Sequence, residues 1–593
     1  RILLYQEFEH KMWLEYQWIV VCGGLLAVFV AYGIGANDVA NAFGSSVGSK
    51  AITIKQALVI AAIFEFGGAV LLGAGVTDTV RKGIADFSKF QDAPELLMYG
   101  MLCVLLATGL WLILASYFEL PVSTTHSTVG GVIGMAICAK GAGAVTWMGS
   151  GGNVLGGVVG IVLSWVFSPV LSAILAIVLF GGVRVLVLRS QNSYVRSWYV
   201  FPVLVFLTVL VNSFFIIFKG AKSKLKGLEP VDAVWISFVI GGVAALIVTF
   251  GVVPFLKKRV DREFEAAEQA EAAKAQAAEE GAEKGVDEGK VQIESVEAEP
   301  EKKNFWSTIT SGANHDVHSA IEEDDAVNAI HEFSEKFDPK TEESFKYLQV
   351  FTAICDSFSH GANDVANSIG PFAAIWGIYK YEGLKKKTEV PIWILVLGGF
   401  GIVLGLATYG YKIMCSIGVK MCRITPTRGF AIELGAAVVI VIGSQLGIPL
   451  STTHCQVGAT VGVGLLESLS KGVNWKLIGK VVVGWVMTLI IVGLTTAGFF
   501  AQGVYAPSVV NIREREELQG GIKDAVIQMV NTLSSSNIDI VGGNLTLINE
   551  TITNLTNHSL YEAQVVDSVK FNNVLLEATT GLTHSLAHQL NKT

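Results

Sequence analysis

Long uninterrupted runs of apolar residues alternate with short polar segments along most of this chain of 593 residues. Several runs reach the length that a helix needs to cross the hydrocarbon core of a bilayer. The pattern predicts an all-α fold, a polytopic transmembrane helix bundle of about 12 membrane segments. Ten full-length segments are expected at 17–43, 54–76, 96–117, 150–188, 199–219, 231–256, 346–376, 391–413, 429–447 and 474–505.

Two shorter apolar pieces, 121–139 and 449–466, each follow a proline and a Ser/Thr cluster. They could be short spans or re-entrant helical hairpins, which are tolerated at membrane depth where protein or a water-filled cavity covers them. Segment 150–188 is too long for one simple crossing. Segment 474–505 is expected to form two half-length passes or a helix pair, because this would place the following tail outside the cell.

The composition supports a membrane protein. Only 16% of the residues are charged, against about 25% in soluble globular chains. The seven cysteines lie mainly in or beside apolar segments and lack the spacing of a disulfide framework or a zinc site. We therefore expect lipid around the chain, no transition metal, no cofactor and no nucleic-acid partner.

Two polar segments indicate the orientation. Segment 257–345 is rich in Ala, Glu and Lys, which favours a solvated helix or a disordered linker. It opens with the basic cluster 257–259 directly after a span, which indicates the cytoplasmic side. The tail 506–593 carries five N-x-S/T glycosylation sequons and is expected to be extracellular. The candidate glycosylation sites are Asn544, Asn549, Asn554, Asn557 and Asn591.

The chain contains an internal repeat. The heptad GANDVAN at 35–41 returns at 361–367, and PVSTTH at 121–126 returns as PLSTTH at 449–454, with nearly the same offset. Two membrane halves with matching polar segments are typical of secondary transporters, whose substrate site lies at the repeat interface near the midplane. The halves are inverted only if an odd number of crossings separates them, which here requires 150–188 to cross twice.

The predicted domain organisation follows from this repeat. It comprises a first transmembrane repeat (1–198), connecting helices (199–256), a charged cytoplasmic loop (257–345), a second repeat (346–505) and the tail (506–593).

The two GANDVAN heptads offer hard oxygen ligands. Their glycines are expected to loosen the helix and free backbone groups, while two amides share one helical face beside a carboxylate. Such a set suits an alkali or divalent cation rather than a transition metal. The alternative is ordinary interhelical hydrogen bonding. The residues concerned are Asn37, Asp38 and Asn41 in the first copy and Asn363, Asp364 and Asn367 in the second.

The P-x-S-T-T-H segments offer donors to an oxyanion. A helix that begins there points free N–H groups and its positive dipole end at whatever lies in front, and the hydroxyl groups add donors. The alternative is simple capping of a membrane hairpin. The hydroxyl residues are Ser123, Thr124 and Thr125, and Ser451, Thr452 and Thr453.

Three histidines and two acids complete the candidates. His126 and His454 could touch the ligand or support its ligands, and His360 has no counterpart in the first copy, where Ile34 stands. Glu65 and Glu433 lie in apolar surroundings as cation ligands or gates, with a structural hydrogen bond as the alternative. The aspartates would repel an anion until cations neutralise them, which gives a physical basis for coupling.

At these residues the chain resembles the inorganic phosphate transporter (PiT) family, over about 17–256 and 346–505. The segment FTAICDSFSHGANDVANSIGPFAAIW is similar to the second signature of the eukaryotic sodium-dependent members. The resemblance implies sodium–phosphate symport by alternating access, with the loop inside and both termini outside. It further implies phosphate held by the hairpin Ser/Thr and signature Asn residues, sodium at Asp38 and Asp364, and acids at Glu65 and Glu433 that matter for transport.

The resemblance has limits. Some animal members carry another acid where Met101 stands here, so that role is not carried over, and the sequon-bearing tail is not explained. A proton-coupled symporter and a phosphate sensor stay open as alternatives, as does a homodimer. An intramembrane hydrolase is disfavoured, because duplicating a Ser/His set serves no single nucleophile, so the chain is not expected to be an enzyme. The expected location is the plasma membrane.

Overall fold

A computed structural model describes residues 14–82, 84–149, 156–217, 230–283, 312–385, 390–445 and 450–505. The chain divides into two units after Phe500, and the first unit contains the helical bundle. The predicted tail with its five sequons lies outside the described residues, as does 284–311 of the predicted loop.

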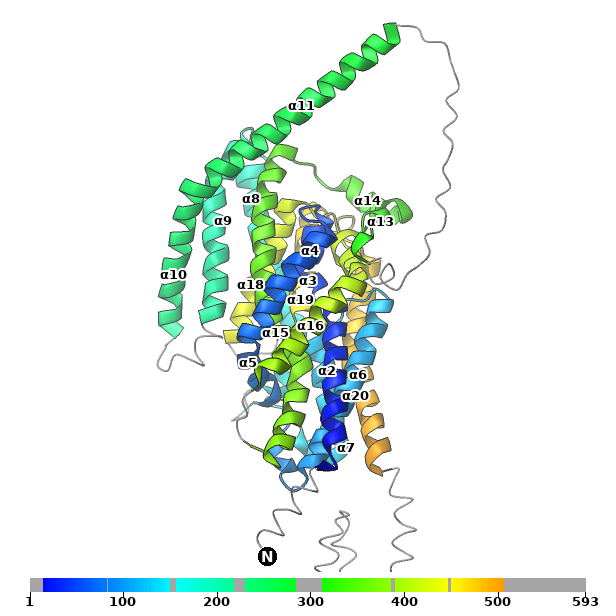
Figure 1. The fold of residues 1–593 in the computed structure, drawn as a ribbon. Helices are drawn as coiled ribbons and strands as arrows, with labels where there is room; N and C mark the ends of the chain where they lie inside the picture. Colours follow the sequence, from blue (N-terminus) through cyan, green and yellow to red (C-terminus); the bar gives the residue numbers. More distant parts are fainter. Residues whose placement is uncertain are drawn as a thin grey trace, which may run out of the picture. The chain divides into compact units, whose positions relative to one another are not determined.

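All long elements of the described residues are helices (Figure 1), which confirms the all-α prediction. Short π-helical turns continue several of them, among them η1 (Ala61–Glu65), η5 (Arg184–Leu188), η8 (Val248–Val252) and η10 (Ser416–Lys420). The α-helices are α2 (Gln17–Asn37), α3 (Ala40–Gly48), α4 (Ile54–Ile60), α5 (Phe66–Lys82), α6 (Pro94–Tyr117), α7 (Thr124–Lys140), α8 (Gly157–Val183), α9 (Ser193–Phe215), α10 (Pro230–Ile247), α11 (Val253–Glu283), α13 (Ser319–Glu323), α14 (Asp325–Phe333), α15 (Pro339–Tyr381), α16 (Ile392–Tyr409), α17 (Tyr411–Cys415), α18 (Pro426–Gln445), α19 (Thr452–Glu467) and α20 (Trp475–Tyr505).

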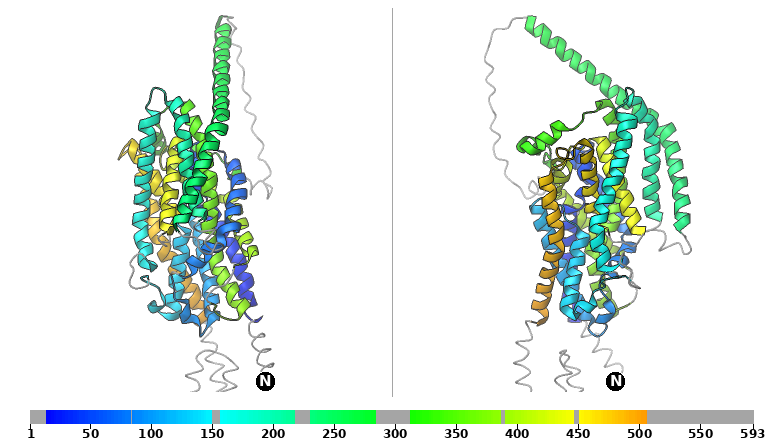
Figure 2. Two further views of the ribbon diagram at one scale, coloured as in Figure 1. Left: turned by 90° about the vertical axis from the view of Figure 1, so that its left-hand side faces the viewer. Right: turned by 180° about the vertical axis from the view of Figure 1, so that it is seen from behind.

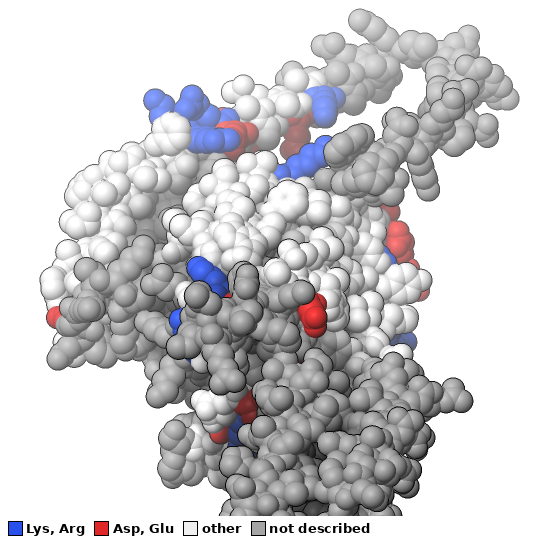
Figure 3. Space-filling model, turned by 60° about the horizontal axis from the view of Figure 1, so that its bottom comes forward, with Lys and Arg blue, Asp and Glu red and all other residues white. Residues whose placement is uncertain are grey.

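The outer surface of these helices is suited to lipid. Within the described residues, nine helical segments are long and apolar enough to cross a membrane. Large apolar side chains stand on their outside, for example Phe167 at 63%, Leu494 at 70% and Phe250 at 77% exposure. Figure 3 shows broad uncharged areas between few charged side chains on one such face. In water such patches would favour aggregation, whereas acyl chains cover them without penalty.

Two predicted connections are wrong. Segment 474–505 is one continuous helix, α20, rather than a pair of passes. Segment 150–188 does not cross twice, because α8 begins at Gly157 and continues through η5 to Leu188 without a turn. With a rise of about 1.5 Å per residue, both helices exceed the hydrocarbon thickness. Their extra length therefore does not fold them back.

The signature glycines serve helix packing. The second heptad lies inside the continuous helix α15, and at the first the chain keeps near-helical dihedral angles between α2 and α3. The expectation that glycine frees the backbone is therefore wrong for the second copy. Instead, a Cβ at Gly35 would overlap the carbonyl of Ile402, and one at Gly361 would overlap the carbonyl of Glu65. Glycine is needed because the helix backbones nearly touch.

These close contacts are reciprocal. Gly405 of α16 approaches the carbonyl of Tyr32 in α2, and Gly68 of α5 approaches the carbonyl of Phe358 in α15. Tyr32 and Phe358 occupy equivalent positions just before the two heptads. Each signature helix thus packs on a helix of the other half, and the pairs α2–α16 and α15–α5 correspond. Glu65 then corresponds to Ile402.

Helices α7 and α19, which begin in the two P-x-S-T-T-H segments and are named the hairpin helices here, exchange partners in the same way. Gly130 and Gly134 of α7 lie against the backbone of α20. Their equivalents in the second hairpin, Gly458 and Gly462, lie against Pro169 and Ala173 of α8. Each set is a small-xxx-small pattern, which lets helices approach closely in lipid.

Helices α7 and α19 end at different places in the fold. Lys140, at the end of α7, pairs with Asp92 at 2.8 Å, whereas Glu467, at the end of α19, accepts from Glu335 N at 2.9 Å. In Figure 1, α7 lies toward the end opposite α13 and α14. The two hairpin helices therefore lead from a shared centre toward opposite ends of the bundle.

The predicted loop is partly packed on the bundle. Helix α11 continues α10 beside α9, in agreement with the predicted solvated helix (Figure 2). Residues 312–338, in contrast, rest on the bundle, where His331 Nε2 lies 3.0 Å from Val419 O. Glu335 accepts from Arg184 Nε at 2.8 Å and from Arg189 Nη2 at 2.9 Å. These hydrogen bonds hold the pKa of Glu335 below its usual value, and they fix this part of the predicted loop on the bundle.

Gly458→Ala tests the partner exchange. A Cβ there would overlap the Pro169 backbone, so we expect the purified protein to lose about 1–3 kcal/mol of stability in thermal unfolding. The matched control is Gly182→Ala in α8, where a Cβ meets no atom of the described residues. Helix propensity should make that control neutral or up to ~1 kcal/mol more stable. Equal Tm values for the two variants would contradict the packing.

Candidate functional site

The N-termini of α7 and α19, called the hairpin starts here, meet the first GANDVAN heptad at one carboxylate, that of Asp38. Asp38 is only 1% exposed. Its Oδ2 accepts from Thr124 Oγ1 and, at 3.2 Å, from Thr124 N. Its Oδ1 accepts from Thr453 Oγ1 of the other hairpin. Two threonines from opposite halves of the chain therefore share a single buried carboxylate.

The second signature closes the same cluster from the other side. Asp364 is fully buried and accepts from Thr452 Oγ1 at 3.2 Å. Asn367 Nδ2 lies 3.2 Å from both Thr124 Oγ1 and Thr125 Oγ1 of the first hairpin. The structure thus brings together two aspartates, one signature amide and four of the predicted hydroxyl residues.

The two hairpin serines cap their helices. Ser123 Oγ accepts from His126 N and Ser451 Oγ accepts from His454 N, both at 3.2 Å. Each cap satisfies one of the otherwise unpaired N–H groups in a first helical turn. Of the alternatives for these segments, capping is therefore observed for the serines, while the threonines point into the cluster of aspartates.

The signature asparagines have different surroundings. Asn37 Oδ1 accepts from Val122 N at 2.9 Å, and its Nδ2 donates to Ser116 Oγ and Leu120 O at 3.0 Å. Its amide holds the turn that precedes the first hairpin helix. Asn363 Nδ2 donates to Asp364 Oδ1 at 2.9 Å. The side chain of Asn41 lies outside the described residues.

Glu65 and Asp364 are bridged by one imidazole. His360 Nδ1 lies 2.6 Å from Glu65 Oε1, and His360 Nε2 lies 2.7 Å from Asp364 Oδ2. Glu65 stands at the end of the π-helical turn η1, a distortion common at functional sites, and also accepts from Ser357 Oγ at 3.1 Å. His360 therefore links Glu65 to the central aspartate, and only the second signature carries this histidine.

Glu433 occupies a separate polar cluster. It accepts from Ser45 Oγ at 2.6 Å, from Ser46 Oγ at 2.8 Å and from Thr352 Oγ1. Gln349 Nε2 adds a contact at 3.3 Å. Glu433 thus joins the end of α3 to α15. Sequence reasoning missed these neutral partners, because single Ser, Thr and Gln residues in apolar helices carry no spacing signal.

His126 and His454 face each other behind the hairpin starts. Their ring centroids lie 4.8 Å apart. His126 packs on Trp165 of α8 at 4.8 Å, and His454 stacks on Trp485 of α20 at 3.8 Å. Both rings lie among aromatic side chains rather than beside the aspartates, so of the two roles left open, the supporting one fits the geometry.

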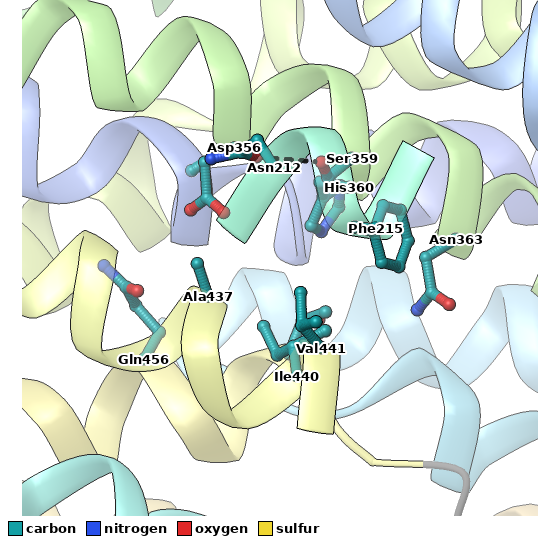
Figure 4. Close-up of a pocket in the computed structure, with 12 residues that line it drawn as sticks. Asn212, Phe215, Asp356, Ser359, His360, Asn363, Ala437, Ile440, Val441 and Gln456 are labelled. Atoms are coloured by element: carbon teal, nitrogen blue, oxygen red, sulfur yellow. Dashed lines mark hydrogen bonds between the residues drawn. The ribbon is translucent and has the colours of Figure 1, made fainter. Parts of the chain in front are cut away.

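A small cavity borders the central cluster. Its volume is about 30 Å³, and His360, Asn363 and Thr452 of the cluster are among its lining residues. Figure 4 labels the first two. The cavity also exposes Asp356, which sequence reasoning did not single out. The available signal was an acid within an apolar span, since such residues are functional by default.

Comparisons with known proteins agree with these motifs. A family model described as the phosphate transporter family matches residues 34–496. The phosphate-repressible phosphate permease pho-4 of Neurospora crassa is 32% identical, over 83% of this chain and 98% of its own. Sodium-dependent phosphate transporter 1 of Rattus norvegicus is 28% identical, over 82% and 95%. A solved structure titled "The sodium-dependent phosphate transporter" matches with a TM-score of 0.61 and 32% identity, over 81% of this chain and 98% of that one.

His360→Leu tests the carboxylate bridge. It leaves Glu65 and Asp364 buried without their shared partner, which should cost about 3–5 kcal/mol of stability. The double variant Glu65→Leu/His360→Leu removes one unpaired charge and should be more stable than the sum of the two single losses. Thermal unfolding of the purified variants checks both. Additive losses would show that the two residues do not interact.

Proposed function

Because the chain belongs to the phosphate transporter family, we propose that it imports inorganic phosphate across the plasma membrane by sodium-coupled symport. The family comprises membrane transporters rather than enzymes, and phosphate is its substrate. The proposal adds the coupling ion, the direction and the membrane. A sodium-dependent relative and the sodium-dependent solved structure support the choice of ion.

One observation carries the proposal: both hairpin starts converge on the carboxylate of Asp38. Thr124 and Thr453 donate to it from opposite halves, while Asn367 and Thr452 bring Asp364 to the same cluster. Hydroxyl, amide and helix N-terminal N–H groups suit the oxygens of phosphate. The aspartates suit sodium.

Coupling follows from the charges. Two carboxylates at membrane depth repel an anion strongly, because little solvent screens them there. Sodium at Asp38 and Asp364 removes that repulsion, and the hydroxyl groups of Thr124, Thr125, Thr452 and Thr453 can then exchange their contacts for phosphate oxygens. Cation and phosphate each raise the affinity for the other, as symport requires.

Alternating access fits the reciprocal packing. We propose that the halves 1–198 and 346–505 are inverted repeats, joined by 199–256, and that they rock about the shared hairpin starts. The opposite destinations of α7 and α19 support this directly, in place of the double crossing of 150–188, which the continuous helix α8 excludes. In the same proposal the loop 257–345 is cytoplasmic and the tail 506–593 is extracellular and glycosylated. The single helix α20 suffices for this position of the tail, because it runs away from α13 and α14 toward the opposite end of the bundle (Figure 1). Lipid surrounds the spans, and two copies form a homodimer.

Proton coupling is the second candidate. The imidazole of His360 lies between two carboxylates at 2.6 and 2.7 Å and could pass a proton between them. Sodium and proton make different demands, since sodium needs carbonyl and carboxylate oxygens whereas a proton needs one titrating group.

Asp38→Asn and Asp364→Asn test the cation site. In proteoliposomes with an inward sodium gradient, each variant should lose at least about tenfold of radiolabelled phosphate uptake, because an amide attracts sodium far less than a carboxylate. If a proton gradient drives uptake in the absence of sodium, the coupling ion is the proton rather than sodium. Phosphate uptake that is unchanged in both variants would overturn the site.

Thr453→Val tests the role of the hairpin hydroxyl. A hydrogen bond to a charged group contributes about 1.5–3 kcal/mol, so the KM for phosphate should rise about tenfold or more, and Thr453→Ser should restore it. Thr460→Val on the same helix is the control, because Thr460 Oγ1 donates only to the helical carbonyl of Gln456 among the described residues. An equal KM in Thr453→Val and Thr460→Val would contradict the assignment.

A further inference from the structure

Asp356 is an intramembrane carboxylate that the central site does not use. It lies on α15 one helical turn before His360, and it is only partly buried. Among the described residues, no group forms a hydrogen bond or ion pair with its side-chain carboxylate. The equivalent position before the first heptad holds Val30, so only the second half carries this acid.

A buried amide faces Asp356 across the cavity. Gln456 of α19 is 2% exposed, and its Nε2 has no hydrogen-bond partner among the described residues. Figure 4 shows the Asp356 and Gln456 side chains directed toward each other. In the first hairpin the corresponding residue is Thr128, which instead donates to Asn367 O at 3.3 Å. The amide and the acid thus form an arrangement that the first half lacks.

The surroundings leave the charge of Asp356 without compensation. The described residues that line the cavity include no Lys or Arg. The charge of Asp356 interacts with His360 and Glu65, and with Glu433 and Cys455. His360 is already shared by two carboxylates. From the remaining cavity elements only neutral groups face it, such as Asn212 of α9 and Ala42 of α3.

An uncompensated carboxylate at membrane depth is costly, so such groups are paired, protonated or bound to an ion. The cavity of about 30 Å³ has room for one or two waters or a largely dehydrated monovalent cation. Asp356 and Gln456 supply oxygen atoms, which hard cations prefer.

We propose that Asp356 and Gln456 form a further binding site for one monovalent cation, sodium ion or proton, which moves with phosphate in addition to the charges at the paired aspartates. The site borders His360, Asn363 and Thr452, which contact Asp364. Its cation therefore lies next to the central cluster and lowers the repulsion that phosphate meets there. This inference rests on the proposed symport.

Equilibrium accumulation measures the number of coupled cations. The full chain is reconstituted in liposomes at zero membrane potential, and phosphate accumulation is measured against a sodium gradient and, separately, a pH gradient. With an about tenfold gradient of the coupled cation, Asp356→Asn should lower phosphate accumulation about tenfold, because each coupled cation contributes one such factor. The gradient whose effect weakens identifies the ion as sodium or proton.

Three variants sharpen the experiment. Asp356→Glu should keep the parent accumulation, and Gln456→Leu should keep the cation number while raising the cation concentration at half-maximal uptake. Glu265→Gln removes an exposed carboxylate of α11 and should change nothing. Parent-like accumulation in Asp356→Asn would overturn the inference while leaving the proposed function intact.

A direct measurement of cation binding distinguishes failure of the Asp356 site from failure of the proposed symport. If the parent accumulates phosphate under neither gradient, the proposed symport is wrong. In that case the number of ²²Na⁺ ions bound per purified protein tests whether the Asp356 site exists. The same measurement is used if the Asp356→Asn variant no longer transports. One sodium fewer in Asp356→Asn than in the parent supports a sodium site. Equal sodium binding, together with an equal number of protons taken up between high and low pH, overturns the site for both ions.

Discussion

Two carboxylates buried at membrane depth are the constraint on which the remaining structure depends. Asp38 and Asp364 are 1% and 0% exposed, so polar groups of the protein must solvate them. Both hairpins begin at this point because a helix start is where a membrane chain can supply free N–H groups and hydroxyl donors together. The glycines that let α2 meet α16 and α15 meet α5 bring the backbones close enough to hold the aspartates together.

The two halves share a backbone plan but differ in charge. The packing of α2 on α16 corresponds to that of α15 on α5. In contrast, three charged or titratable residues have apolar counterparts in the other half: His360 corresponds to Ile34, Glu65 to Ile402 and Asp356 to Val30. A symmetric scaffold thus carries an asymmetric set of titratable and charged groups. In the proposed symport, the repeat provides two related conformations, and the asymmetry gives cations a preferred half.

The pairing of the motifs could be predicted from the sequence because identical letters return at nearly one offset. The side chains that each motif residue contacts could not be predicted, because they lie far away in the chain. Examples are the contacts of Asn37 with the 116–122 turn and the contact between Glu65 and His360. Local hydropathy also predicts the apolar lengths of α8 and α20 but not whether they fold back. A turn needs breaking residues, and the single Pro169 is accommodated inside α8.

The exchange of hairpin partners has a consequence for biogenesis. Helix α7 packs on α20, which the ribosome completes only near the end of the membrane region, as the contact between Gly134 and Gly493 shows. At about 5–20 residues per second the first half spends tens of seconds in the membrane with its small-residue face and hydroxyl groups uncovered. During that interval the translocon, lipids or a membrane chaperone must shield these groups. The halves can then mature only together, so a truncated chain is a substrate for quality control rather than half a transporter.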